Sequence, residues 1–328
     1  WYLEAANQGY AEAQFAVGEM YENGQGMPPD YAEALKWYLL AAEQKRGSAN
    51  AQYRIGEMYA KGLGVVQDDA EALKWYTMSA TNNNHAQNAL GLIYSEGRGV
   101  PQNCDEALKW LTQASKGNYE AKYNMGLMYE EGRCVDKDEA EAFRLYKDAG
   151  RSGISGYNKA KFKMGLFYEE GRVVAQDYAE AFNCFEDVAR DGLAEAQYKL
   201  GLMFAEGRGT NQDDIEAFMW LTLAAEQGHA DALQYLTTIL AKGEDYGKVN
   251  AGELYDSGLK ALDELNYPQN NVVAFKWFTL AAKKNEPRAQ CKLGEMFAEG
   301  KVVPEDYTKA VQWFTKAAEQ GNVEAQVY

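Results

Sequence analysis

Tryptophan recurs in this chain at one position of a repeating pattern, and this repetition constrains the fold more than any other feature. Segments of the form Ala-Leu-Lys-Trp end at Trp37, Trp75 and Trp110, and later segments align with them. All seven tryptophans share this position, namely Trp1, Trp37, Trp75, Trp110, Trp220, Trp277 and Trp313. Two further copies keep the frame with Leu145 and Cys184 in place of tryptophan, and most spacings are 35 to 39 residues. A period of this length is typical of a repeat array.

A second motif, an apolar residue followed by glycine, precedes the tryptophan motif. Its glycines, called the packing glycines below, are Gly18, Gly56, Gly91, Gly126, Gly165, Gly201 and Gly294. Another glycine follows six residues later, as Gly24 follows Gly18. A glycine inside a helix costs about 1 kcal/mol relative to alanine and is tolerated where two helices approach closely. A glycine just after a helix adopts the left-handed cap. The motif therefore predicts a helix with one close contact and a defined end.

Aspartate or asparagine precedes the helix that carries the tryptophan. These residues are Asp30, Asp68, Asn103, Asp138, Asp177, Asp213, Asn270 and Asp306. Glutamate stands three residues later at Glu33, Glu71, Glu106, Glu141, Glu180 and Glu216, whereas Val273 and Lys309 depart from this pattern. The spacing predicts a capping box at the start of a second helix. If the tryptophan of that helix is buried, replacement of Trp75 by alanine costs about 3–5 kcal/mol.

The combined string, Ala-x-x-x-Leu-Gly-x-Met-Tyr-x-x-Gly-x-Gly-Val followed by Ala-x-x-Trp-x-x-x-Ala-Ala, resembles the Sel1-like repeat, a relative of the tetratricopeptide repeat. The resemblance covers nearly the whole chain. It implies an all-α fold, a right-handed α/α superhelical solenoid of about eight to nine two-helix repeats. Residues 1–328 are expected to form one such solenoid, with partial repeats at both ends, because a single hairpin cannot bury its apolar faces alone. The resemblance also implies an adaptor in protein complexes.

The period breaks between Thr237 and Gly294, and we predict an irregular insert at about 243–271. Residues 230–243 have the pattern of a first helix in which Thr237 replaces the packing glycine, but no second helix follows at the expected distance. The segment 244–271 then carries apolar residues at helical spacing, namely Leu254, Tyr255, Leu259, Leu262 and Leu265. This segment is either an extra helix packed on the array or a docking element for a partner.

The net charge of −16 argues against nucleic acid as a partner, because that binding depends on Lys and Arg. Basic or amphipathic protein segments are the expected partners, within a larger complex. In the alternative, the acidic residues only cap helices and maintain solubility. No run of about 18 apolar residues is present, so membrane insertion of this segment is not expected, and no compartment is assigned. Cys104, Cys134, Cys184 and Cys291 fall at four phases of the repeat, which predicts neither a disulfide ladder nor a metal cluster.

The cysteine-rich secreted branch of the Sel1-like family bridges the two helices of every repeat by a disulfide. This chain lacks that regular cysteine pair, and the β-lactam binding linked to that branch is not carried over.

One face of the first helices is the candidate partner-binding surface. At 100° per residue, it carries the positions three before, one after, and four and five after the packing glycine. Its residues are Tyr123, Leu127, Glu130, Glu131, Phe162, Leu166, Glu169, Glu170, Tyr198, Leu202 and Glu206. We predict an apolar strip with an acidic border, which suits a segment that carries apolar and Lys/Arg residues. In the alternative, packing between repeats occupies these side chains.

Catalysis is not expected from this sequence. Only two histidines are present, His85 and His229, in different repeats, which disfavours a histidine triad or a zinc site. Asp138 lies in a segment that starts like a calcium loop, but Glu141 and Lys147 stand where that loop requires Gly and Glu. We therefore expect a non-catalytic scaffold without cofactor or metal. The alternative is a regulatory or substrate-recruiting subunit of an enzyme or a membrane-associated complex.

Overall fold

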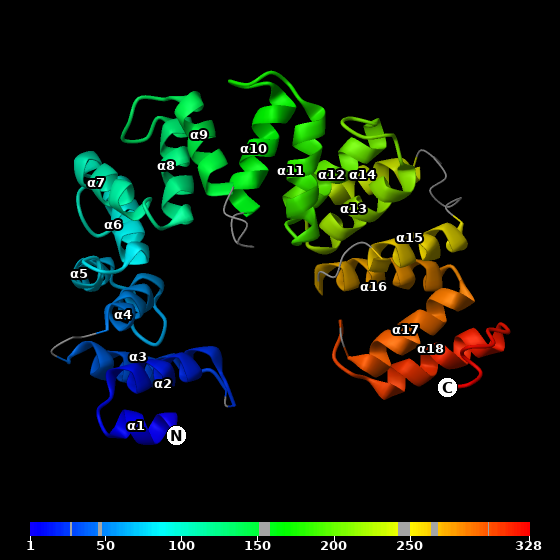
Figure 1. Cartoon of the computed structure of the whole chain (residues 1–328), viewed down its shortest axis with the longest axis horizontal. Coiled ribbons are helices and arrows are strands. Elements are labelled where there is room, and N and C mark those ends of the chain that lie inside the picture. The colour runs from blue at the N-terminus through cyan, green and yellow to red at the C-terminus, as the bar shows by residue number, and fades with distance from the viewer. Residues whose placement is uncertain (27, 45–47, 151–157, 242–249, 264–267, 301) are drawn as a thin grey trace. The chain divides into compact units, whose positions relative to one another are not determined.

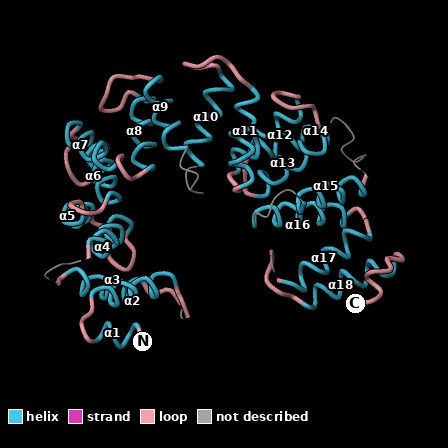
Figure 2. Tube along the Cα trace, in the orientation of Figure 1, coloured by secondary structure: helices cyan, strands magenta, loops and turns pink. Residues whose placement is uncertain are grey.

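The computed structural model describes the chain except for residues 27, 45–47, 151–157, 242–249, 264–267 and 301 (Figure 1). Every regular element among the described residues is an α-helix, and loops join the helices (Figure 2). The chain divides into two compact units, Trp1–Lys163 and Met164–Tyr328, and each is described by itself. Among the described helices, none combines the length and the apolar character needed to cross a membrane.

The first unit contains α1 (Tyr2–Asn7), α2 (Ala11–Asn23), α3 (Tyr31–Ala42), α4 (Ala49–Lys61), α5 (Asp69–Ser79), α6 (Asn84–Glu96), α7 (Cys104–Ala114), α8 (Tyr119–Glu131) and α9 (Glu139–Gly150). The boundary between the units lies within α10 (Asn158–Glu170). The second unit continues with α11 (Tyr178–Arg190), α12 (Ala194–Glu206), α13 (Asp214–Glu226), α14 (Ala230–Ala241), α15 (Ala251–Asp263), α16 (Pro268–Lys283), α17 (Pro287–Glu299) and α18 (Tyr307–Glu319).

These helices pair as hairpins, which confirms the predicted α/α solenoid of two-helix repeats. The first helices of the hairpins are α2, α4, α6, α8, α10, α12, α15 and α17, and each pairs with a second helix that carries the tryptophan position. Where the residue after a first helix is described as its cap, it is the predicted glycine in the left-handed conformation, with φ between 62° and 70°.

The hydrogen bonds at the start of the second helices match the predicted capping box only in part. The Asp68 carboxylate accepts hydrogen bonds from the backbone N–H groups of Ala70 and Glu71, as an N-cap should. A capping box also requires a bond from the Asp68 N–H to the Glu71 side chain, and this part of the prediction is wrong. The Asp68 N–H donates instead to the carbonyl of Tyr59 on the preceding first helix (3.0 Å). The side chain of Glu71 pairs with Lys74, one turn along the same helix. The same backbone bond recurs at the start of other second helices, so it joins the two helices of a hairpin.

Asn270 does not occupy its predicted place. The described part of α16 begins at Pro268, so Asn270 lies inside the helix and not at its N-cap. Proline is favoured in the first helical turn, where its missing N–H has no partner to lose.

Each packing glycine faces the residue twenty positions further along the chain. A Cβ atom built on Gly126 would lie 2.6 Å from Cε1 of Tyr146, and one on Gly165 would lie 2.5 Å from Cε1 of Phe185. Real Cβ atoms do not approach so closely, so glycine at this position lets the second helix lie against the first. The facing residue is always the one that follows the tryptophan position.

The core of each hairpin therefore lies one residue beyond the tryptophan. The facing residues are all buried: Tyr38, Tyr76, Leu111, Tyr146, Phe185, Leu221, Phe278 and Phe314. Among the tryptophans, Trp220 and Trp277 are buried, Trp37, Trp75, Trp110 and Trp313 are half-buried, and Trp1 is exposed. Trp75 packs against the apolar cluster formed by α3 and α4, and Trp110 against the cluster of α5 and α6. The tryptophan thus covers the junction with the preceding hairpin.

The segment that interrupts the repeat is not the predicted insert. Helix α15, within the predicted insert, is a regular first helix whose Gly258 faces Phe278 on α16. The added element is α14, which packs on α13, and the structure describes no second helix between α14 and α15 outside the undescribed residues 242–249. Its residues 230–241 do follow the predicted first-helix pattern. The rest of the predicted insert, including Leu265, lies partly outside the described residues.

Candidate interaction surface

The aromatic residues of the predicted face are partly occupied by packing. The ring of Tyr123, on α8, lies 5.6 Å from that of Tyr146, and burial raises the pKa of Tyr123. In the second unit, Tyr198 on α12 stacks on His229 at 4.5 Å. Phe162 on α10 is half-buried. These aromatic residues present only part of their surface to a partner.

The glutamates four residues after the packing glycine do not form the predicted acidic border. In the first unit, Glu130 accepts a hydrogen bond from the Tyr146 hydroxyl (2.7 Å) and pairs with Nζ of Lys163 (2.9 Å) on the next first helix. In the second unit, the Glu169 side chain is 8% exposed and pairs with Lys199 (2.7 Å) and Arg208 (3.3 Å). Burial and the bond to Glu130 raise the pKa of Tyr146. Both glutamates therefore connect neighbouring repeats.

The glutamates one residue further on are exposed, and each pairs with an arginine two residues along. Exposed fractions of the Glu131, Glu170 and Glu206 side chains are 53%, 49% and 47%. The carboxylate-to-guanidinium distances are 3.3 Å for Glu131 and Arg133, 2.7 Å for Glu170 and Arg172, and 2.6 Å for Glu206 and Arg208. The border of the face thus carries both charges.

Leucine one residue after the packing glycine forms the apolar part of the face, here called the leucine row. Leu127 in the first unit, and Leu166 and Leu202 in the second, are half-buried. The structure adds Leu92 on α6 and Leu259 on α15 at the same position and with similar exposure. The sequence contains the signal for Leu92, which follows the predicted packing glycine Gly91. Leu259 follows Gly258, whose contact with Phe278 is seen only in the structure.

Charged residues replace this leucine in the remaining repeats. Glu19 on α2 and Glu57 on α4 both pair with Arg54, at 3.7 and 3.2 Å. In the second unit, Glu295 on α17 pairs with Lys292 at 2.7 Å. Along the chain, the face therefore changes from charged to apolar in the first unit and from apolar to charged in the second.

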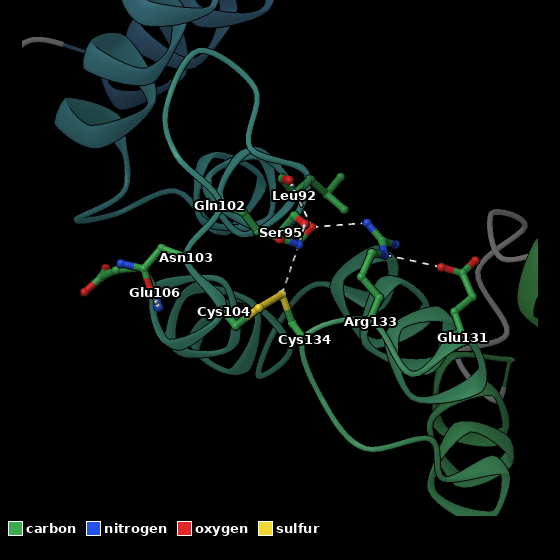
Figure 3. Close-up of a disulfide and its surroundings, with 9 residues drawn as sticks. All are labelled: Leu92, Ser95, Gln102, Asn103, Cys104, Glu106, Glu131, Arg133 and Cys134. Atoms are coloured by element: carbon green, nitrogen blue, oxygen red, sulfur yellow. Dashed lines mark hydrogen bonds and ion pairs between the residues drawn. A yellow bond between two sulfur atoms is a disulfide. The ribbon is translucent and has the colours of Figure 1, made fainter.

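An arginine seven residues after the packing glycine was missed by the sequence analysis. Arg133 donates to the Ser95 hydroxyl (3.2 Å) on the preceding first helix (Figure 3). It also lies 3.7 Å from the carboxylate of Glu96 on that helix. In the second unit, Arg208 reaches Glu169 in the same way. The available signal was the recurring Glu-Gly-Arg triplet, of which 131–133 and 206–208 are copies.

A disulfide joins Cys104, the first residue of α7, to Cys134 in the loop after α8 (Figure 3). The four different phases of the cysteines predicted no disulfide ladder. This single bond was not predicted, because its two cysteines come from different positions of the repeat and face each other only across a junction. Cys134 accepts a long hydrogen bond from the Gln102 amide (3.8 Å). Cys184 is buried. Cys291 is a buried free thiol, and burial raises its pKa to about 11.

The two histidines lie in different units, His85 in the first and His229 in the second. No group of three or more His, Cys, Asp or Glu side chains in the part of the chain that the structure describes could hold a metal ion. His85 contacts the Asn118 amide (3.2 Å) beside an open polar hollow of about 480 Å³ in the first unit. His229 stacks on Tyr198 and caps the backbone of Ala232.

Comparison with known proteins identifies the repeat. A family model of the Sel1 repeat matches residues 11–45, 49–84, 85–119, 120–154, 158–192, 194–229, 249–286 and 287–322. The seventh match contains the hairpin of α15 and α16, whereas α14 lies outside the matches. No curated protein matches the sequence significantly.

Among the solved structures that resemble the chain, two share 32% sequence identity with it. One is a protective antigen present in uropathogenic Escherichia coli strains and displaying an SLR fold, with a TM-score of 0.61 and 32% identity over 100% of this chain and 73% of that protein. The other is a Sel1 repeat protein from Oxalobacter formigenes, with a TM-score of 0.62 and 32% identity over 67% of this chain and 89% of that protein.

Proposed function

Since this chain belongs to the Sel1 repeat family, we propose that it is a non-catalytic adaptor whose first-helix face binds partner segments carrying apolar and basic residues. Sel1 repeat proteins generally mediate protein–protein interactions and are typically non-catalytic scaffolds. The proposal assigns that general role to a defined surface of this chain.

The leucine row is the observation that carries the proposal. Leu92 and Leu127 in the first unit, and Leu166, Leu202 and Leu259 in the second, keep part of their side-chain surface exposed. Partly exposed leucines at one position of successive helices offer an apolar surface on which an amphipathic segment can pack. The chain carries a net charge of −16, so long-range attraction favours a partner with Lys and Arg beside its apolar residues.

The test measures binding of a synthetic helical peptide with leucines on one face and lysines on the other, by fluorescence anisotropy. Leu92→Ser combined with Leu127→Ser, both in the first unit, should weaken binding by about tenfold, because each change removes apolar contact area. The control, Leu40→Ser combined with Met78→Ser, removes side chains of comparable size that are 45% and 49% exposed on second helices. The proposal fails if the control weakens binding as much as the leucine-row variant does.

Charge is tested separately on residues that do not connect repeats. Glu170→Lys combined with Glu206→Lys, both in the second unit, should weaken binding of the same peptide, and the difference from the parent protein should shrink at high salt. Glu130 and Glu169 are left unchanged, because reversing their charge would disrupt the packing between repeats. An affinity unchanged at every salt concentration would exclude a role for the border in partner selection.

The alternative function, recruitment to one enzyme or membrane-associated complex, predicts a different binding pattern. An array of many peptides with varied apolar and basic residues should give broad binding if the chain is a general receptor. Purification of the tagged chain would instead recover one stoichiometric enzyme if it is a dedicated subunit.

A further inference from the structure

One loop position of the repeat requires a close approach between consecutive hairpins. It lies eight residues after the packing glycine, and Gly64 and Gly99 occupy it with φ of 69° and 66°. A Cβ atom on Gly64 would lie 2.6 Å from the carbonyl carbon of Tyr31, and one on Gly99 would lie 2.7 Å from Cβ of Asp69. Tyr31 and Asp69 are the first residues of α3 and α5, the second helices of the preceding hairpins. The loop therefore rests on the start of the neighbouring hairpin's second helix.

Cys134 occupies this same position, with φ of 64°, and Cys104 occupies the facing position as the first residue of α7. The two cysteines thus stand where other junctions place glycine against the first residue of a second helix. Their Cα atoms are 4.8 Å apart, and the disulfide spans 30 residues of sequence. Both side chains are half-buried, so a small reductant can reach the bond.

We propose that the Cys104–Cys134 disulfide is a reducible clasp that holds the loop after α8 against α7, and that its reduction loosens this one junction while both hairpins stay folded. The inference concerns the junction itself and is independent of the proposed partner binding. Each hairpin retains its own contacts, including Gly126 against Tyr146 and the Asp138 N–H bonded to the Tyr129 carbonyl (2.9 Å).

The chemistry is a thiol–disulfide exchange with a dithiol reductant. One thiolate of the reductant attacks a cysteine sulfur, and its second thiol resolves the mixed disulfide. The S–S bond breaks, Cys104 and Cys134 each gain one hydrogen, and the dithiol becomes a cyclic disulfide. The two cysteine sulfurs must then separate to non-bonded distance, which moves the loop away from α7.

The loop carries a connection to the preceding first helix. Arg133, next to Cys134, donates to the Ser95 hydroxyl, and the Gln102 amide donates to the Ser95 carbonyl (2.9 Å) as well as contacting Cys134 (Figure 3). Movement of the loop therefore weakens contacts on both sides of the junction. The expected effect is local to 98–106 and 132–138.

Hydrogen–deuterium exchange of the oxidised protein and of the same protein reduced with dithiothreitol tests the clasp. Amides of 98–106 and 132–138 should exchange at least about tenfold faster after reduction, whereas those of α2 to α4 should be unchanged. Equal exchange in the two states would overturn the proposal. So would faster exchange throughout the first unit, since the disulfide would then support the whole fold and not one junction.

A glycine junction provides the matched control. Cys104→Asp combined with Cys134→Gly reproduces the pairing of Asp69 with Gly99 at the preceding junction. This variant should show slow exchange at 98–106 and 132–138 with or without dithiothreitol. Exchange at 98–106 and 132–138 could instead be fast in the variant while the parent protein still responds to dithiothreitol as before. The close approach of positions 104 and 134 would then not hold the loop.

Discussion

At the scale of single residues, the packing glycine and the residue twenty positions later form the central contact of each hairpin. Gly126 against Tyr146 and Gly258 against Phe278 are examples from the two units. The contact places a large side chain where the first helix has none, so apolar burial and close backbone approach occur at the same point. In hairpins whose tryptophan is only half-buried, such as that of Trp75, we expect the residue after the tryptophan position to contribute more to stability than the tryptophan itself.

Substitutions at two adjacent positions test this ranking. Tyr76 is 4% exposed and faces Gly56, whereas Trp75 is half-buried at the junction with the preceding hairpin. Tyr76→Ala should cost about 3–5 kcal/mol of unfolding free energy, as for a buried aromatic residue. Trp75→Ala should cost about 1–3 kcal/mol, because less apolar area leaves water on folding. Urea denaturation monitored by circular dichroism gives both values, and a larger loss for Trp75→Ala would reverse the assignment.

Residue roles that depend on local sequence were predictable, and those that depend on the next repeat were not. The glycine caps and the Asp68 N-cap follow from neighbours along the chain. Glu130 looked like a surface acid because its partner, Lys163, is 33 residues away. The disulfide was missed for the same reason, since its cysteines face each other only across a junction. A charge or thiol is interpreted correctly only when positions are compared between consecutive repeats.

At the scale of helices, hairpins are joined by buried polar contacts as well as by apolar packing. The Gln87 amide, on α6, donates to the Ala80 carbonyl at the end of α5 (2.7 Å), and Gln197 does the same to Ala189 in the second unit (3.1 Å). These bonds satisfy carbonyls that a helix end leaves without an intrahelical partner. Together with the Glu169 ion pairs, they fix how one hairpin sits on the next.

The Glu169 cluster allows a direct test of such a junction. Glu169→Gln should destabilise the second unit by about 1.5–3 kcal/mol, because Lys199 and Arg208 lose a largely buried charged acceptor. The control, Glu186→Gln, removes an ion pair with Arg190 along one helix, with side chains 31% and 38% exposed. Its cost should be about 0.3–0.5 kcal/mol. Equal costs in thermal denaturation would show that Glu169 is no more important than a surface pair.

Helix identity near the break in the period was harder to predict than elsewhere. The pattern around Ala230 correctly indicated a first helix, α14. The second helix of the next hairpin was predicted from Trp277, whereas its first helix, α15, was interpreted as part of an insert, since no second helix follows α14 at the expected distance. Gly258 of α15 follows a serine and not the apolar residue of the motif. Gly258 faces Phe278 in the structure. This contact could not be predicted, because the motif around Gly258 is altered.

At the scale of the molecule, each compact unit is a stack of hairpins, and each hairpin is stabilised by the hairpins next to it. Trp75 and Trp110 cover clusters formed by the preceding junctions, so part of every core belongs to two repeats. In such arrays, stability is approximately a sum of repeat terms and nearest-neighbour terms. The same arrangement leaves the leucine row accessible along successive first helices, which is the basis of the proposed adaptor function.

Hydrogen–deuterium exchange of Gly126→Ala is the most direct test of this neighbour dependence. The added Cβ would lie 2.6 Å from the Tyr146 ring and should destabilise the hairpin of α8 and α9 by about 1–3 kcal/mol. Gly252→Ala, where the nearest atom is 3.4 Å away, is the control and should not accelerate exchange. Because each hairpin is stabilised by the next, Gly126→Ala should also accelerate exchange in α6 and α7. Acceleration confined to α8 and α9 would show that the preceding hairpin does not depend on its neighbour.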